Sequence, residues 1–264
     1  MNFLLSFLIK LPLFNRLIPS IGIRLLKLIK KNRGYFKIGD TKMFLDFLDP
    51  IDRELILYQK YEHEEISILN KLIKTHSVNY FFDIGSNCGY YSLQLGKIFE
   101  KLKILSFEPN EEAYFKFNKT LSINQNISEK ITLYNFGLSD RDSTLKMRSL
   151  VKYGYRQTGG STIHDDENYE DKNYKNVKVY KANFKIADEV IDINNSVLAI
   201  KIDVEGHEYK VLKGLKRTIN NNKCILQLEI MNHNFEKVNK FLTENKFYKV
   251  DEVKNRSNYF YKNF

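Results

Sequence analysis

The sequence predicts an open α/β fold built around a mostly parallel sheet with helices on both faces. Short apolar runs alternate with segments of helical spacing from residue 78 onward. The first run turns through Asp83-x-Gly85-x-x-x-Gly89 into a helical pattern. The second run ends at Glu108, roughly 20 residues later, where nucleotide-binding sheets carry an acidic residue.

The bulk composition fits one α/β domain with extensions. The chain has 264 residues, of which 43% are hydrophobic, and a formal net charge of +10. That charge suits acidic partners, although lysine is abundant throughout the chain and a compositional habit explains it equally well. Two cysteines without a framework of spacings, Cys88 and Cys224, favour a reducing, cytoplasmic compartment.

Residues 1–34 form a leader that is distinct from the domain at 35–264. After Ser20 the leader predicts a helix with an apolar stripe and a basic side, formed respectively by Ile21, Leu25, Leu28, Ile29 and by Arg24, Lys27, Lys30, Lys31. Such a helix either packs on the domain or lies peripherally on the inner face of an anionic membrane through residues 20–31. Neither a membrane span nor a secretory signal is expected.

The elements of the domain follow in order. Short strands are expected at 35–38 and 43–46, and a helix at 51–75 whose charge-dense start, 61–65, should face solvent. Apolar runs predict strands at 78–83, 103–108, 131–136, 197–203 and 224–230. Helical spacing predicts helices at 90–99, 111–123, 209–218 and 235–245. The pieces 247–250 and 258–261 should close the chain as an antiparallel hairpin.

An insertion at 137–196 interrupts this rhythm. It contains an alternating segment at 143–148, small residues around Gly159 and Gly160, and a probable strand at 177–184. Long intervals inside compact domains usually carry function. We therefore expect this insertion to face the substrate and to be mobile around its two glycines.

Polar residues cluster where the predicted strands end. Ligands of open α/β sheets bind beyond the carboxyl ends of the strands. Four strands deliver carboxylates or a neighbouring histidine to that rim: Asp83, Glu108, Asp203 with Glu205 and His207, and Glu229. Asp140 joins them from the loop after the strand at 131–136. This concentration predicts an enzyme that uses a ribose-containing cofactor.

The motifs resemble those of the FkbM family of S-adenosylmethionine-dependent methyltransferases. The resemblance rests on Asp83-Ile84-Gly85-Ser86-Asn87-x-Gly89-Tyr90-Tyr91-Ser92, Phe107-Glu108-Pro109-Asn110, Leu138-Ser139-Asp140 and Lys201-Ile202-Asp203-Val204-Glu205-Gly206-x-Glu208, within about residues 60–232. It implies a seven-stranded Rossmann-like class I fold and O-methylation of a hydroxyl on a sugar, glycoconjugate or related natural product.

The resemblance also implies roles for single residues. Asp83, Gly85 and Gly89 would hold the methionine part of S-adenosylmethionine, Glu108 the ribose, and the stretch from Phe136 to Asp140 would flank the adenine. The cofactor-binding set is completed by Ser86, Asn87, Tyr90, Ser92, Pro109 and Asn110. A hydroxyl is a poor nucleophile, so a base is expected among Glu205, Asp203 and His207, with Glu229 as the fallback. Oxygen ligands near Asp203 would suit Mg²⁺, but no ligand spacing supports a metal.

Other interpretations stay open at this point. Tyr209-x-x-x-Lys213 would suit an NAD(P)-dependent reductase of the short-chain type, although Tyr91 replaces the third glycine. The positive charge would suit an RNA methyltransferase, although Asp203-Val204-Glu205-Gly206 is not the turn that base methylation needs, and nucleic acid is not the expected partner. A non-enzymatic membrane adaptor is the third alternative. The acceptor and the oligomeric state are not encoded in any recognisable signature.

Overall fold

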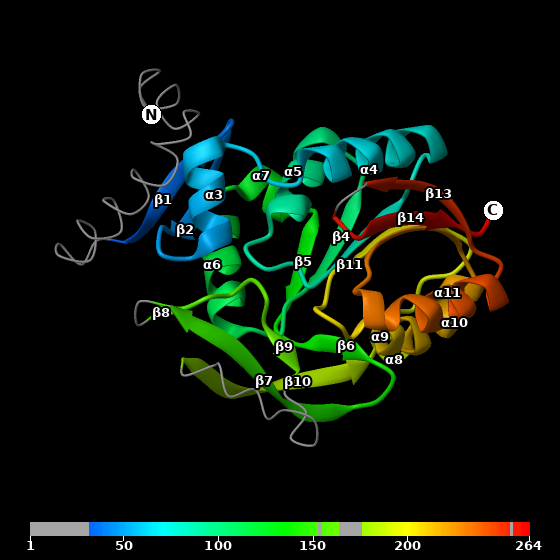
Figure 1. The fold of residues 1–264 in the computed structure, drawn as a ribbon. Coiled ribbons are helices and arrows are strands. Elements are labelled where there is room, and N and C mark those ends of the chain that lie inside the picture. The colour runs from blue at the N-terminus through cyan, green and yellow to red at the C-terminus, as the bar shows by residue number, and fades with distance from the viewer. Residues whose placement is uncertain (1–31, 153–154, 164–175, 254–255) are drawn as a thin grey trace.

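The computed structural model describes residues 32–152, 155–163, 176–253 and 256–264 (Figure 1). The predicted leader helix and its membrane contact at 20–31 lie outside these ranges. Within them, no helix is long and apolar enough to cross a bilayer.

A seven-stranded sheet in the order β13-β14-β12-β11-β3-β4-β5 forms the centre of the molecule. Its neighbours from β12 to β5 pair in parallel, and β14 runs antiparallel to both β12 and β13. The sheet is therefore mixed, and the expected closing hairpin is confirmed. The strands are β3 (Tyr80–Ile84), β4 (Lys103–Phe107), β5 (Ile131–Tyr134), β11 (Val197–Ile202), β12 (Lys223–Glu229), β13 (Tyr248–Val253) and β14 (Asn258–Lys262).

Helices cover both faces of this sheet, as expected. Successive side chains of a strand point to opposite faces, so Phe81 and Phe82 of β3 enter different cores. Phe81 packs with α3 (Pro50–Tyr58), α4 (His63–His76), α5 (Tyr90–Ile98), α6 (Glu111–Leu121) and α7 (Gln125–Ser128). Phe82 packs with α8 (Ala187–Val190), α9 (Glu208–Gly214), α10 (Lys216–Asn220) and α11 (Phe235–Glu244), which follows the 3₁₀ turn Asn232–Asn234.

Two predicted helices are each broken in two. The helix expected at 51–75 divides into α3 and α4, because Gln59 and Glu62 adopt left-handed backbone angles (φ 61° and 44°). The helix expected at 209–218 divides into α9 and α10 at Leu215. The first break matters for function, because it turns the start of α4 toward the carboxyl end of the sheet.

The insertion builds a second sheet rather than a loose loop. Its order is β6-β10-β7-β8, with β9 on β7. The strands are β6 (Gly137–Ser139), β7 (Ser143–Lys152), β8 (Tyr155–Arg156), β9 (Thr162–Ile163) and β10 (Val177–Ile186). The predicted strands at 143–148 and 177–184 are thus confirmed, and they pair antiparallel over their length. In Figure 1 this sheet lies below the central sheet, beside α9.

A two-stranded hairpin completes the fold on the side of α6. Strands β1 (Arg33–Ile38) and β2 (Thr41–Asp46) pair antiparallel, as predicted. The backbone N–H of Phe44 donates to Thr120 Oγ1 at 2.9 Å, which fixes β2 to α6. Asn32 and Arg33 both donate to the Asp46 carboxylate, which ties the start of β1 to the end of β2.

Candidate active site

The turn between β3 and α5 has the geometry of a cofactor cradle. Gly85 and Gly89 have φ angles of 81° and 79°, which only glycine adopts without strain. A Cβ at Gly85 would overlap the carbonyl oxygen of Asp203, and one at Gly89 would overlap the Phe117 ring. The two glycines therefore let β3, the end of β11 and α6 meet closely at this corner.

Two buried polar atoms at this turn have no partner. Asp83 is 1% exposed; its Oδ2 accepts from Ser92 Oγ at 2.6 Å, whereas its Oδ1 makes no hydrogen bond. Ser86 Oγ is likewise buried without a partner. Buried polar groups are nearly always paired, so unpaired ones indicate an absent ligand or solvent. Both residues line a small cavity that Tyr90, Lys201 and Tyr61 also line.

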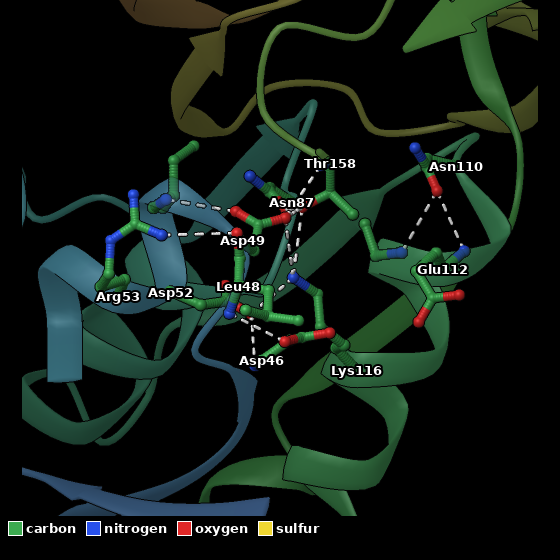
Figure 2. Close-up of polar contacts among 12 residues, drawn as sticks. Asp46, Leu48, Asp49, Asp52, Arg53, Asn87, Asn110, Glu112, Lys116 and Thr158 are labelled. Atoms are coloured by element: carbon green, nitrogen blue, oxygen red, sulfur yellow. Dashed lines mark hydrogen bonds and ion pairs between the residues drawn. The ribbon is translucent and has the colours of Figure 1, made fainter. Parts of the chain in front are cut away.

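Glu108 stands next to the turn with its carboxylate already oriented. Oε2 accepts from the Asn87 N–H at 2.8 Å and Oε1 from the Asn110 N–H at 2.7 Å. Burial raises the pKa of this carboxyl to about 7, although both N–H groups act in the opposite direction. The Asn110 side chain caps α6 by accepting from the N–H groups of Glu112 and Ala113 (Figure 2). Pro109, which lies between Glu108 and Asn110 in the chain, lines the main cavity.

The main cavity, at the carboxyl ends of the strands, has a volume of about 180 Å³. From the central sheet it is lined by Gly85, Asn87, Glu108, Pro109, Asp203, Val204, Glu205, His207 and Glu229. The insertion contributes an apolar wall of Met147, Ile163 and Phe184 and the segment Thr158–Ser161. The expected substrate-facing side of the insertion thus borders the same cavity as the cofactor turn.

Several predicted cofactor residues lie behind the cavity or away from it. Ser92 and Gly89 support the turn from behind. Phe136 packs at tilted angles against the rings of Phe107 and Tyr134, while Gly137 and Leu138, which follow it, line the cavity. The Asp140 carboxylate accepts from the ammonium groups of Lys210 and Lys213 instead of facing the cavity.

Of the predicted bases, Glu205 lines the cavity and lies next to Gly160 of the insertion. The chain leaves the extended form directly after Asp203, with φ 53° at Glu205 and 101° at Gly206. Strained backbone of this kind concentrates at functional sites. Burial raises the Glu205 pKa to about 7, with the charges of Asp203 and Glu208 adding to the effect, while a hydrogen bond from the Gly160 backbone lowers it. A base with a pKa near the working pH is well matched to general-base catalysis.

Asp203 and Glu229 are instead engaged with each other and with a cation. The Lys201 ammonium donates to Asp203 Oδ2 at 2.8 Å. Burial and the neighbouring Asp203 charge raise the pKa of Glu229 well above its usual value, and its side chain hydrogen-bonds Asp203. Glu229 therefore holds its proton to higher pH than a free carboxyl does.

His207 reaches the cavity from the start of α9. Its Nε2 lies 2.9 Å from Ser139 Oγ, and its ring meets the edge of Phe184 with 5.6 Å between centroids. These contacts tie the catalytic segment to β6 and β10 of the insertion.

The prediction that residues 61–65 form a solvated face is wrong for three of them. Tyr61 and Glu62 line the cavity; Glu62 is only 8% exposed, and Glu65 is 1% exposed. Glu62 Oε2 accepts from Tyr91 OH at 2.7 Å. The missed signal is periodicity: Glu62 and Glu65 share a helical face with the buried Ile66, Leu69 and Ile73.

Two alternatives find no matching geometry. Across the described residues, no group of three or more His, Cys, Asp or Glu side chains is arranged to hold a metal ion. Tyr209 packs on Phe241, and Lys213 pairs with Asp140. The tyrosine–lysine pair of the reductase hypothesis therefore does not line the cavity.

Fold and site together are those of an α/β protein of the methyltransferase type. The central sheet is mixed and seven-stranded, and one cavity is bordered by the glycine turn after β3, by Glu108 after β4 and by Asp203 after β11. Comparison with known families agrees, because the model of the methyltransferase FkbM domain matches residues 83–250. The chain belongs to the FkbM methyltransferase family, and the resemblance noted in the sequence is confirmed.

The relatives found are distant from this chain. The methyltransferase sdnD of Sordaria araneosa is 28% identical over 163 residues, covering 52% of this chain and 60% of the relative. Methyltransferase 1 of Beauveria bassiana is 24% identical over 151 residues, covering 52% and 58%. The crystal structure of methyltransferase FkbM from Methylobacillus flagellatus superposes with a TM-score of 0.48 at 17% identity, covering 70% of this chain and 43% of that one. The matched region thus spans about three fifths of the curated relatives.

Proposed function

We propose that the protein is an S-adenosylmethionine-dependent O-methyltransferase that acts on a hydroxyl of a sugar, glycoconjugate or related natural product. The observation that carries this proposal is the pair of unpartnered buried atoms, Asp83 Oδ1 and Ser86 Oγ, beside the glycine turn. They lie next to a cavity that also contains Glu205, so a cofactor and a base would share one enclosure.

The residues present suit this cofactor. Asp83 and Ser86 would receive its amino acid end, and Glu108 would accept from the ribose hydroxyls with the lone pairs that the backbone leaves free. Carboxyl groups of Glu62, Asp203 and Glu229 face the cavity, while Lys201 is buried beside them. This excess of acid favours a positively charged ligand group. When bound, the cofactor would supply an electrophilic methyl group on a sulfonium.

The chain would then hold the acceptor and remove its proton. The apolar wall of Met147, Ile163 and Phe184 suits the carbon face of a sugar or a related skeleton. Glu205 would accept the hydroxyl proton at its carboxylate, and positioning of donor and acceptor would supply much of the remaining rate. The free, buried thiols of Cys88 and Cys224 support a reducing, cytoplasmic location.

Titration with S-adenosylhomocysteine tests the cofactor site. We expect Glu108→Gln to weaken binding about tenfold or more, because the amide supplies no charged acceptor for the ribose and places an N–H₂ against a backbone N–H. Glu111→Gln is the matched control, since Glu111 is exposed at the start of the same helix, α6. Equal affinities of the two variants would remove Glu108 from the ribose role.

Transfer of a labelled methyl group to cell-envelope extracts tests the acceptor class. An O-methyl ether on a glycan resists mild alkali and ribonuclease, so label should survive both treatments. Prior acetylation of the glycan hydroxyls should abolish labelling. Label released by ribonuclease would point to the RNA alternative and would contradict the proposal.

A further inference from the structure

Four consecutive residues of the insertion line the cavity and contact three different parts of the fold. Thr158 bonds to Asp49 at the start of α3, and Gly159 packs against Ile51 so closely that a Cβ would overlap it. Glu205 Oε1 lies 3.9 Å from the position of a Cβ at Gly160, and the Gly160 backbone lowers the Glu205 pKa as a hydrogen-bond donor. Ser161 Oγ lies 2.7 Å from Ser149 Oγ on β7. We call residues Thr158–Ser161 the strap.

The strap is held by a buried cluster of charged side chains that no sequence motif predicted. Lys116 of α6 is 1% exposed, and its ammonium lies 2.6 Å from Asp52 Oδ2, 3.4 Å from Asp49 Oδ2 and 3.2 Å from Thr158 Oγ1. Asp49 Oδ2 in turn accepts from the Thr158 N–H at 2.8 Å and from its hydroxyl at 2.6 Å. Figure 2 shows these groups converging between α3, α6 and the strap.

The charges of the cluster explain why Thr158 is needed there. One ammonium faces two carboxyls. Burial raises the pKa of Asp52 to about 7, whereas at Asp49 the Lys116 charge and the Thr158 hydrogen bonds outweigh burial and lower the pKa. Asp49 is therefore the ionised partner, and Thr158 supplies two of its donors. Losing donors to a buried carboxylate is costly, so the cluster favours a seated strap.

The same threonine also contacts the cofactor turn. Its Oγ1 lies 2.9 Å from Asn87 Oδ1. Asn87 has a left-handed φ of 48°, and its N–H donates to Glu108. One side chain thus joins the ion cluster, the turn that would hold the cofactor, and the strap that reaches Glu205.

We propose that Thr158, seated on the Asp49–Lys116 cluster, is a positioning residue that fixes the Gly160 N–H against the Glu205 carboxylate. This inference rests on the proposed function insofar as Glu205 is taken as the base. Thr158 acts on Glu205 only through the strap and does not touch the reacting atoms. Gly160, with φ 70°, gives the strap the turn that it needs to reach Glu205 from Thr158.

Amide hydrogen exchange tests the proposal without any turnover. In Thr158→Val the hydroxyl is lost, and we expect the Gly160 N–H to exchange about tenfold faster, as the loss of one charge-assisted hydrogen bond predicts. Thr158→Ser should restore the slow exchange. Thr144→Val, an equivalent change on β7 where the hydroxyl bonds Asn183, should leave it unchanged. Thr158→Ala repeats the test with no risk of overpacking.

The pH dependence of turnover supplies a second readout. The charged groups that act on Glu205 are Asp203, Glu208 and Lys201. The Gly160 hydrogen bond lowers the Glu205 pKa, so its loss in Thr158→Val should move the rise of activity to higher pH, and Thr158→Ser should move it back.

The outcomes separate this inference from the proposed function. Unchanged Gly160 exchange in both Thr158→Val and Thr158→Ala would overturn the positioning role. Faster exchange together with a fully active Glu205→Gln variant would support the strap and refute Glu205 as the base. An inactive Glu205→Gln variant, together with unchanged Gly160 exchange in the Thr158 variants, would support Glu205 as the base and refute the positioning role of Thr158.

Discussion

At the scale of single residues, the site gives different surroundings to three carboxyls that the sequence offers as candidate bases, Asp203, Glu205 and Glu229. Asp203 is paired with Lys201, and burial and the neighbouring Asp203 raise the pKa of Glu229. Burial raises the Glu205 pKa to about 7, and the Glu205 backbone has a strained, left-handed φ. The proposed proton acceptor is thus distinguished by its surroundings rather than by its residue type.

Replacing Glu205 by glutamine should lower the turnover number about 10²–10⁴-fold, the usual contribution of a positioned base. The ionised carboxylate is the active form, so wild-type activity should rise with pH through about 7, the Glu205 pKa. The variant should lose this rise. The measurement is the pH profile of the turnover number.

Affinity for S-adenosylhomocysteine serves as the control, and it should be equal in both proteins. A variant that keeps the wild-type rate and its pH profile would contradict the assignment.

At the scale of elements, the cofactor turn depends on how α6 packs against it. Gly89 caps α5 with φ 79°, and the Phe117 ring of α6 occupies the space where a Cβ would lie. Phe117 is fully buried in the same core as Leu93 and Leu95 of α5. A short glycine motif is therefore specified from outside the motif, by an aromatic residue on the next helix.

Gly89→Ala should lower the free energy of unfolding by about 2 kcal/mol or more, since strain at positive φ and overpacking each cost about 1–3 kcal/mol. In a protein that already carries Phe117→Leu, Gly89→Ala should lower the free energy of unfolding by less, because the smaller side chain relieves the overlap but not the φ strain. Urea denaturation provides the measurement.

Gly34→Ala is the matched control, because nothing lies within 4 Å of its Cβ position. Equal destabilisation by Gly89→Ala and Gly34→Ala would show that the Phe117 contact does not constrain the turn.

At the scale of the whole molecule, residues 32–264 should fold without the segment that precedes them. Asn32 and Arg33 are bonded to Asp46, so the contacts that fix the β1–β2 hairpin lie within residues 32–264. We propose that the basic segment 20–31 binds anionic lipid. The full chain should then float with phosphatidylserine vesicles, and a chain starting at Asn32 should not.

Vesicles of neutral lipid, or high salt with anionic ones, serve as controls and should abolish flotation of the full chain. Equal flotation of both chains on anionic vesicles would end the membrane hypothesis for the leader.

The sequence predicted the central sheet well because its signals are local. Apolar runs, the Gly85–Gly89 turn and the Asn110 cap each lie within a few residues of the element that they specify. The strap could not be predicted in this way. Thr158 and Asp49 are 109 positions apart, and nothing in either neighbourhood indicates the other. Composition predicts the wrong environment for Glu62, because a charge-rich stretch usually faces solvent. The helical periodicity of α4 is the signal that indicates its burial.

The arrangement at Glu108 has one more consequence, for the choice between nucleotides. Both oxygens of this carboxylate are held by backbone N–H groups, so it cannot swing aside. An adenosine with free ribose hydroxyls offers donors that match it. A ribose bearing a 2′-phosphate would instead press an anion against this fixed carboxyl, and none of the described residues that line the cavity is an arginine that could offset the repulsion. We therefore expect that this corner, if it holds a nucleotide, discriminates against NADPH by charge.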